Sequence, residues 1–247
     1  MFPVLKKILE KITGSESIYK SPTDMGVNRA GFGIIDDKIV KHAAEQEVIR
    51  RYFRCACEYA MGLAEKEVVQ RVELIMEELN LKPEDRLVVV PARNAIEDAQ
   101  QSKKGHEGVF CGAAIELKDG SIYTGKNSSL MHAVSSLILN AVKELAEIPD
   151  KIHVLAPNVI ESIGNLKKNI LNTKAVSMDL EETLIALSIS ATTNPTAQFA
   201  MEKLRELKGC EVHMTHIPTP GDEAGLRKLG VNTTSDPNFS TKTLFVE

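Results

Sequence analysis

Over the first eighty residues, apolar positions recur at helical spacing. One helix is expected over residues 5–12, and Gly14 is a natural residue to end it. Two further helices are expected between residues 37 and 79, with a break at Met61 and Gly62. The intervening residues, 14–36, are polar and rich in glycine, which predicts a long loop that is functional or packed on something else. Residues 1–80 are therefore expected to form a mostly helical segment.

The clearest local pattern is the string GAAIELKDGSIYTGKNSS at residues 112–129. Two β-rich runs flank Asp119 and Gly120, a dipeptide that supplies the positive φ angles of a tight turn. We therefore expect a β-hairpin. The apolar stripe that follows, up to Leu145, predicts a helix that Asn127 or Ser128 caps.

Strand and helix patterns alternate over the rest of the chain. Residues 152–157, 210–217 and 231–235 have the composition of strands, and the run LVVV at 87–90 fits either a short strand or a buried helix. Helices are expected over residues 159–171, 180–193, 195–207 and 220–229, the last ended by Gly230. This alternation predicts an α/β fold for residues 81–247, with a parallel or mixed sheet covered by helices on both faces.

Composition and charge narrow the classes of function. The 247 residues are 43% hydrophobic and 26% charged, as is usual for a globular protein, and the net charge of −4 gives no reason to expect nucleic acid as a partner. The N-terminus lacks the pattern of a signal peptide, and the longest uncharged run, residues 183–201, contains too many polar residues for a membrane span. Four unevenly spaced cysteines do not suggest a disulfide framework. A cytoplasmic location without membrane contact is expected.

Several long strings resemble a bacterial family of unknown function. They are YKSPTDMGVNRAGFGI, GAAIELKDGSIYTGKNSSLMHA, LIALSISATTNP and GCEVHMTHIPTPGDEAGLRKLGVN, and they are similar to the domain-of-unknown-function family eighteen forty-six. Family members are about twice as long, and the resemblance implies that this chain is their C-terminal half. In the family the other half carries a Gly-rich, Gly-Lys loop suggestive of phosphate binding. The resemblance thus implies that a nucleotide would bind in the missing N-terminal half, and that this chain has no cofactor.

A second, more distant resemblance is to the cytidine deaminase fold, which begins with a hairpin of this kind. There the next helix opens with His-Ala-Glu or Cys-Ala-Glu, in which the His or Cys binds zinc and the Glu shuttles protons. The next strand ends in Pro-Cys-x-x-Cys, whose two cysteines are the other zinc ligands. The corresponding strings here are HAV at residues 132–134 and PNVIE at 157–161. Because His132 alone cannot hold a catalytic zinc, the resemblance implies a deaminase-like architecture without its metal. His132 is then a packing or capping residue, or a ligand contact.

Three polar segments follow the ends of predicted strands or helices, where α/β proteins often bind ligands. They contain Thr124, Lys126, Asn127 and Ser128; Thr192 and Asn194; and Thr215, His216, Thr219 and Asp222. The first segment offers hydroxyls, backbone N–H groups and an ammonium that suit a phosphate or a carboxylate. His216 and Asp222 are candidates for a catalytic acid–base pair. The alternative is that these side chains are ordinary helix caps and turn residues.

The loop KSPTDMGVNRAG at residues 20–31 is too polar for a core. Its candidate ligand-binding residues are Lys20, Thr23, Asp24, Asn28 and Arg29. The loop either closes over an anionic ligand or docks on the missing N-terminal half or on a neighbouring subunit.

Two hypotheses of function follow. In the first, the chain is half of an enzyme that acts on a phosphorylated or nucleotide-like small molecule. In the second, it is a non-catalytic regulatory or oligomerisation domain. In either case we expect a homo-oligomer or a contact with a partner, because the missing half would leave part of the surface uncovered.

Overall fold

A computed structural model describes residues 2–14, 37–102, 105–106, 108–173 and 175–241. The chain divides into two compact units, residues 1–45 and residues 46–247. The first unit contains helix α1 (Phe2–Thr13) and the beginning of helix α3 (Asp37–Ala60). As predicted, α1 ends just before Gly14, whose φ of 65° is the left-handed conformation that ends many helices.

The second unit is an α/β fold around one four-stranded sheet. Along the chain its elements are the rest of α3, α4 (Lys66–Glu78), η2 (Pro83–Asp85), α5 (Val89–Gln101), β1 (Gly112–Glu116), β2 (Ile122–Lys126), α6 (Ala133–Leu145), α7 (Pro157–Asn165), η3 (Leu166–Ile170), α8 (Leu180–Ala191), α9 (Pro195–Lys203), η4 (Leu204–Leu207), β3 (Glu211–Met214), α10 (Pro220–Leu229) and β4 (Asn232–Ser235). No helix among the described residues is both long enough and apolar enough to span a bilayer.

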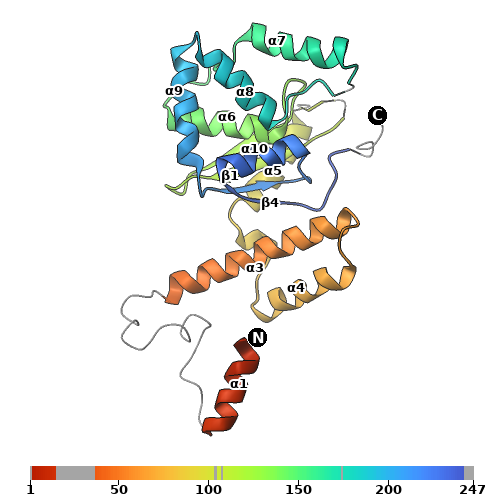
Figure 1. Ribbon diagram of the computed structural model, residues 1–247, viewed down its shortest axis with the longest axis vertical. Coiled ribbons are helices and arrows are strands. Elements are labelled where there is room, and N and C mark those ends of the chain that lie inside the picture. The colour runs from red at the N-terminus through yellow and green to blue at the C-terminus, as the bar shows by residue number, and fades with distance from the viewer. Residues whose placement is uncertain (1, 15–36, 103–104, 107, 174, 242–247) are drawn as a thin grey trace. The chain divides into compact units, whose positions relative to one another are not determined.

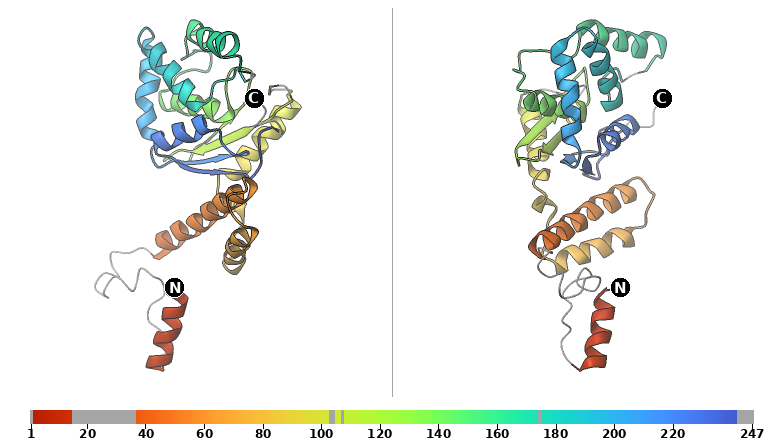
Figure 2. Two further views of the ribbon diagram at one scale, coloured as in Figure 1. Left: turned by 45° about the vertical axis from the view of Figure 1, so that its right-hand side comes forward. Right: turned by 60° about the vertical axis from the view of Figure 1, so that its left-hand side comes forward.

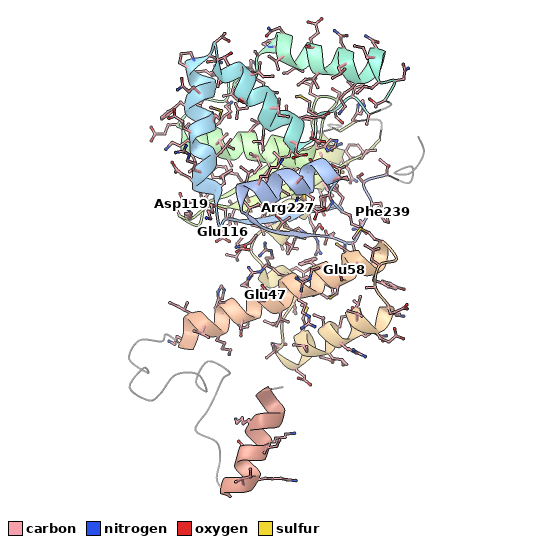
Figure 3. The ribbon with its side chains drawn as sticks, viewed as in Figure 1. Glu47, Glu58, Glu116, Asp119, Arg227 and Phe239 are labelled. Carbon is pink, nitrogen blue, oxygen red and sulfur yellow. The ribbon has the colours of Figure 1, made fainter. Side chains whose placement is uncertain are left out.

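The sheet has the strand order β2-β1-β3-β4. Strand β1 is antiparallel to both β2 and β3, whereas β3 and β4 are parallel, so the sheet is mixed, as expected. The predicted hairpin joins β1 to β2 through Asp119 and Gly120, and Gly120 has a φ of 83°. Figure 3 shows Asp119 beside Glu116 at this end of the hairpin.

Helices cover both faces of the sheet (Figure 1). Ala113 and Ile115 of β1 belong to the main core with residues of α6, α8 and α9, whereas Ala114 packs with Val88 and Ala92 at α5. Figure 2 shows α5, in yellow, on the side of the sheet away from α8 and α9. The alternation of side chains along one strand thus produces two packed layers.

Helix α6 lies unusually close to strand β2. A Cβ atom at Gly125 would lie 2.3 Å from the Leu137 nitrogen and 2.4 Å from the Ala133 oxygen. Only glycine permits this approach, which fixes the start of α6 beside the end of β2.

A buried arginine joins the other two strands. Arg86, 1% exposed, donates hydrogen bonds to Thr234 Oγ1 at 2.9 Å, to the Asn232 carbonyl at 2.7 Å and to the Val212 carbonyl at 3.1 Å. It also pairs with Glu211. These contacts satisfy the buried guanidinium and tie β3 to β4.

Two local predictions are wrong, and a third, which left a strand and a helix open, is settled as a helix. Residues 152–156 form no strand among the described residues, and Pro157 starts α7. The run at 87–90 leads into α5, as the helical alternative predicted, because the Val89 N–H bonds the Arg86 carbonyl. Helix α6 starts after His132 and not after Asn127 or Ser128. Ser128 Oγ instead accepts the N–H groups of the two residues before His132, at 3.2 and 3.3 Å, and holds a turn.

Candidate functional site

The centre of the candidate site is a hydrogen bond between His132 and Asp222. His132 is the residue that precedes α6, and Asp222 lies in the first turn of α10, ninety positions further along the chain. The His132 Nδ1 and Asp222 Oδ2 atoms are 2.8 Å apart. The Asp222 side chain is 0% exposed, and that of His132 is 23% exposed.

Two further donors hold the Asp222 carboxylate. The backbone N–H of Leu180, the first residue of α8, donates to Oδ1 at 2.9 Å. The hydroxyl of Thr219, the N-cap of α10, donates to Oδ2 at 2.8 Å. Because α6, α8 and α10 all begin here, the positive ends of three helix dipoles meet at this carboxylate and stabilise its charge.

The two partners perturb each other's titration. Burial acts to lower the pKa of His132, but the hydrogen bond and the charge of Asp222 outweigh it, so the pKa of His132 is raised. Burial acts to raise the pKa of Asp222, but the bonds from His132, Thr219 and Leu180 outweigh it, so the pKa of Asp222 is lowered. An ionised Asp222 can only accept, so Nδ1 of His132 carries the proton. In the neutral imidazole Nε2 is therefore the basic atom, and no described residue bonds to it.

A second group of charged side chains surrounds the start of α8. Asp179 Oδ1 accepts the Glu182 N–H at 2.9 Å, and Glu182 Oε2 accepts the Asp179 N–H at 3.0 Å. Lys167 bonds Glu182 at 2.8 Å and the Ser177 carbonyl at 2.7 Å. A Cβ atom at Gly221 would lie 2.1 Å from Asp179 Oδ2, so the glycine lets this carboxylate reach the first turn of α10. The sequence interpretation missed Asp179 and Glu182, although their spacing is that of a capping box.

His216, proposed from sequence as the partner of Asp222, is placed differently. It is 5% exposed, and its Nδ1 has no hydrogen-bond partner among the described residues. Burial lowers its pKa to about 4, against the attraction of the Asp222 charge. His216 therefore lies within electrostatic reach of Asp222, while the hydrogen bond to that carboxylate comes from His132.

Cys111 lies in the same region, just before β1. Burial and the charge of Asp222 raise the pKa of the Cys111 thiol to about 12. The group is therefore a thiol near neutral pH, which makes it a poor nucleophile. Among the described residues, no group of three or more His, Cys, Asp and Glu side chains is arranged to hold a metal ion.

The first predicted polar segment and Thr215 meet at the start of β1. The Asn127 amide accepts the Cys111 N–H at 2.8 Å and donates to the Val109 carbonyl at 3.0 Å. Thr215 Oγ1 accepts the Gly112 N–H at 3.0 Å. The Asn127 and Thr215 side chains thus join the ends of strands.

Two other residues of the first segment make contacts elsewhere. Lys126 is 3.4 Å from the exposed Asp98 of α5, so its ammonium has a carboxylate partner. Thr124, in β2, accepts the Asn140 side-chain N–H through its backbone carbonyl at 2.9 Å.

The second predicted segment lies away from this site. Asn194 caps α9 by accepting the N–H groups of Thr196 and Ala197, and the Thr192 hydroxyl bonds the Ile189 carbonyl. Both residues follow the C-terminal end of α8, whose N-terminal end is at Asp222. A helix of 12 residues is about 18 Å long. The segment therefore serves as a helix junction.

Five candidate ligand-binding residues lie outside the described residues. They are Lys20, Thr23, Asp24, Asn28 and Arg29.

Fold and site together define an α/β protein in which a partly exposed histidine pairs with a buried aspartate at three helix N-termini. Family comparisons give the family: residues 84–245 match the C-terminal model of the domain of unknown function DUF1846, and residues 1–80 match its N-terminal model. The chain belongs to this family. The expectation that it resembles only the C-terminal half is corrected, because it also matches the model of the N-terminal domain.

Several relatives are UPF0371 proteins of clostridia. A UPF0371 protein of Clostridioides difficile (strain 630) is 53% identical over 246 residues, which is 99% of this chain and 49% of that protein. A UPF0371 protein of Clostridium botulinum (strain Kyoto / Type A2) is 54% identical over 245 residues, 99% of this chain and 48% of that protein. The chain therefore spans about half the length of the curated relatives it matches.

Proposed function

We propose that the chain is part of an enzyme in which His132 transfers a proton to or from a phosphorylated or nucleotide-like small molecule. The observation that carries this proposal is the His132–Asp222 hydrogen bond, with Nε2 left without a protein partner. A carboxylate that binds one imidazole nitrogen fixes the tautomer and orients the other nitrogen toward a reacting group.

The titration of His132 supports the role. A general acid–base is most effective when its pKa lies near the working pH, and the raised pKa of His132 moves the imidazole in that direction. Asp222 is a positioning residue in this proposal, since all of its contacts are with the protein. The positive ends of α6, α8 and α10 favour an anionic substrate beside the imidazole.

Other parts of the proposal follow from the family resemblance. If a nucleotide is needed, it binds in a part of the longer relatives that this chain does not span. The four cysteines are free thiols, which suits a protein of the cytoplasm. The deaminase-like architecture remains a proposal. The place of His132 before α6 supports it, whereas the strand expected before Pro157 is absent from the described residues.

The test compares the wild type with His132→Gln and with His153→Gln, a change at an exposed histidine. Phosphorylated metabolites and nucleotides are screened for those that raise the melting temperature, and each binder is assayed for turnover. We expect His132→Gln to bind the same compound but to lose about 100-fold or more in rate, while His153→Gln behaves as the wild type. Equal turnover by His132→Gln, or no binder for the wild type, would overturn the proposal.

Exposed apolar side chains on the outer helices favour a second candidate, a non-catalytic regulatory or oligomerisation domain. Ile185 and Ile189, one turn apart on α8, are 59% and 49% exposed, and Phe199 of α9 is 49% exposed. Such residues suit contact with a second copy of the chain or with the remainder of the longer relatives. If a homo-oligomer forms here, Ile185→Glu combined with Ile189→Glu will reduce the mass measured by light scattering to that of a monomer. A mass unchanged by the substitutions would reject this surface.

A further inference from the structure

Residues 157–173, which contain α7 and η3, are only loosely packed on the fold. None of them is buried, whereas α5, α6, α8, α9 and α10 all contain buried residues. In Figure 1, α7 lies beyond α8 as seen from the sheet. Three partly buried side chains of α7 pack against the main core, Val159, Ile160 and Ile163. A segment with so little buried apolar surface opens more readily than the rest of a fold.

The backbone of this segment is also less stable than that of a regular helix. Gly164 lies inside α7, and glycine lowers the stability of a helix relative to alanine. At η3 the Leu171 N–H donates to the Leu166 carbonyl at 2.9 Å, five residues back, which is the hydrogen bond of a π-helix. Such turns are rare and are often found at functional sites. Leu166, Ile170 and Leu171 are 45%, 70% and 58% exposed, so burial of their side chains does not hold η3 in place.

One lysine side chain ties η3 to the backbone that forms the candidate site. The Lys167 ammonium donates to the Ser177 carbonyl at 2.7 Å and to Glu182 Oε2 at 2.8 Å. Ser177 precedes Met178, whose carbonyl accepts the His132 N–H at 2.9 Å. The Lys167 side chain is 14% exposed, so water screens its charge only in part. The contacts of Lys167 therefore bring η3 next to the segment that holds His132.

The two ends of the segment are held differently. At its start, the Ala156 N–H donates to the Ser190 hydroxyl of α8 at 2.9 Å, which fixes this end on the fold. At its other end, the Thr173 hydroxyl and N–H both bond the Lys167 carbonyl at 2.9 Å, so this turn is part of the segment itself. Release of the Lys167 ammonium would therefore free the η3 end while Ala156 stays attached.

We propose that residues 157–173 form a lid over the candidate site, which pivots near Ala156 and is held closed by Lys167. In the closed position the lid narrows the approach to His132, whose side chain is 23% exposed. Opening admits a substrate, and closure then excludes water from the imidazole. This inference rests on the proposed function, because it takes Nε2 of His132 as the atom that reacts.

Hydrogen exchange measured by mass spectrometry tests whether the lid opens. In the wild type we expect the amides of residues 158–170 to exchange at least about 100-fold faster than those of α6. Lys167→Met removes the latch and should speed the exchange of residues 158–170 about tenfold or more, without a change in α9. Lys228→Met is the matched control, because Lys228 pairs with Glu181 at the same turn of α8 but lies outside the lid. Equal protection of residues 158–170 and α6, or equal exchange in Lys167→Met and Lys228→Met, would overturn the proposal.

Chemical modification tests whether the lid covers His132. Diethyl pyrocarbonate acylates neutral imidazole, and peptide mapping measures its rate at each histidine, with the exposed His42 as internal reference. We expect Lys167→Met to raise the rate at His132 about threefold or more relative to His42, and Lys228→Met to leave it unchanged. Faster hydrogen exchange with an unchanged rate at His132 would show a loose segment that does not cover the site, and would overturn the proposal.

A disulfide that holds the lid closed gives the opposite perturbation. A Cβ atom at Gly164 would lie 3.6 Å from Val176 Cγ1, which brings a cysteine pair at these positions within reach of a disulfide. The four native cysteines are buried and do not compete. In Gly164→Cys combined with Val176→Cys, oxidation should slow the modification of His132 about threefold or more, and reduction should restore the rate. Equal rates in the oxidised and reduced protein would overturn the proposal.

None of these measurements requires turnover, so the two proposals fail separately. A lid that opens as expected over a His132 that does not catalyse would reject the proposed function alone. Catalysis by His132 without a lid would reject this inference alone.

Discussion

Replacing Asp222 by asparagine removes the charge at the centre of the site and keeps the size of the side chain. The carboxylate accepts hydrogen bonds from the Leu180 N–H, the Thr219 hydroxyl and the His132 Nδ1–H, and it is 0% exposed. The amide oxygen can keep one of these bonds. Hydrogen bonds to a charged group contribute about 1.5–3 kcal/mol each. Because two of the three bonds are lost, we expect Asp222→Asn to lower the free energy of unfolding by about 3 kcal/mol or more.

The loss should depend on pH in a definite direction. The raised pKa of His132 gives stability that is complete below its unfolded value of about 6.5 and is lost as the pH rises through the folded pKa. The lowered pKa of Asp222 gives stability that is complete above about 3.9 and is lost as the pH falls through the folded pKa. The destabilisation by Asp222→Asn is therefore greatest between about pH 4 and pH 6.5 and smaller above that range.

Urea denaturation at about pH 5 and about pH 8.5 measures this difference. Asp98→Asn is the matched control, because Asp98 is exposed and pairs with Lys126 at 3.4 Å. We expect the control to change the unfolding free energy by less than about 0.5 kcal/mol at either pH. An equal loss for Asp222→Asn at both pH values would refute the coupling between the two residues.

Three further substitutions test the framework of the fold, each by chemical denaturation. Arg86→Met removes the buried guanidinium that bonds two strand carbonyls and pairs with Glu211, so we expect a loss of about 3 kcal/mol or more. The exposed Arg71→Met is expected to lose less than about 0.5 kcal/mol. Asn194→Ala removes the cap of α9 and should cost about 1 kcal/mol; an unfolding free energy equal to that of the wild type would contradict the role of this cap. Gly125→Ala forces a methyl group against α6 and should cost about 1–3 kcal/mol. In the control Gly164→Ala, the nearest atom to the new Cβ lies at 3.6 Å, so this change should be neutral or stabilising. Equal effects of the two substitutions would contradict the close packing of β2 and α6.

Local signals in the sequence predicted much of the fold. Asp119 and Gly120 form the hairpin turn, Asn194 caps α9 ahead of Pro195, and Gly230 ends α10 with a φ of 72°. Each of these residues acts through its own backbone conformation or its nearest neighbours, so the signal is contained in a few consecutive positions.

The failed strand at residues 152–157 shows where such signals end. Its composition is that of a buried strand, but the Ala156 N–H donates to the Ser190 hydroxyl of α8 at 2.9 Å instead of to a neighbouring strand. Whether an apolar run pairs in a sheet depends on elements distant in sequence, which its own residues do not encode.

The sequence predicted only part of the candidate site, because contacts between its residues also depend on elements distant in sequence. His216, Thr219 and Asp222 were selected from sequence as polar residues at element ends, and His132 was selected through the resemblance to the deaminase fold. Their partners were not, because the pairing of Asp222 with His132 and not with the nearer His216 depends on how three helices converge.

The pKa of His132 tests the central claim most directly. Titration followed by NMR of the imidazole signals, in the wild type and in Asp222→Asn, measures it without knowledge of a substrate. We expect a wild-type pKa of His132 above the ordinary value of about 6.5, and a lower pKa in the variant. A wild-type pKa at or below the ordinary value, or one that the substitution leaves unchanged, would contradict the account.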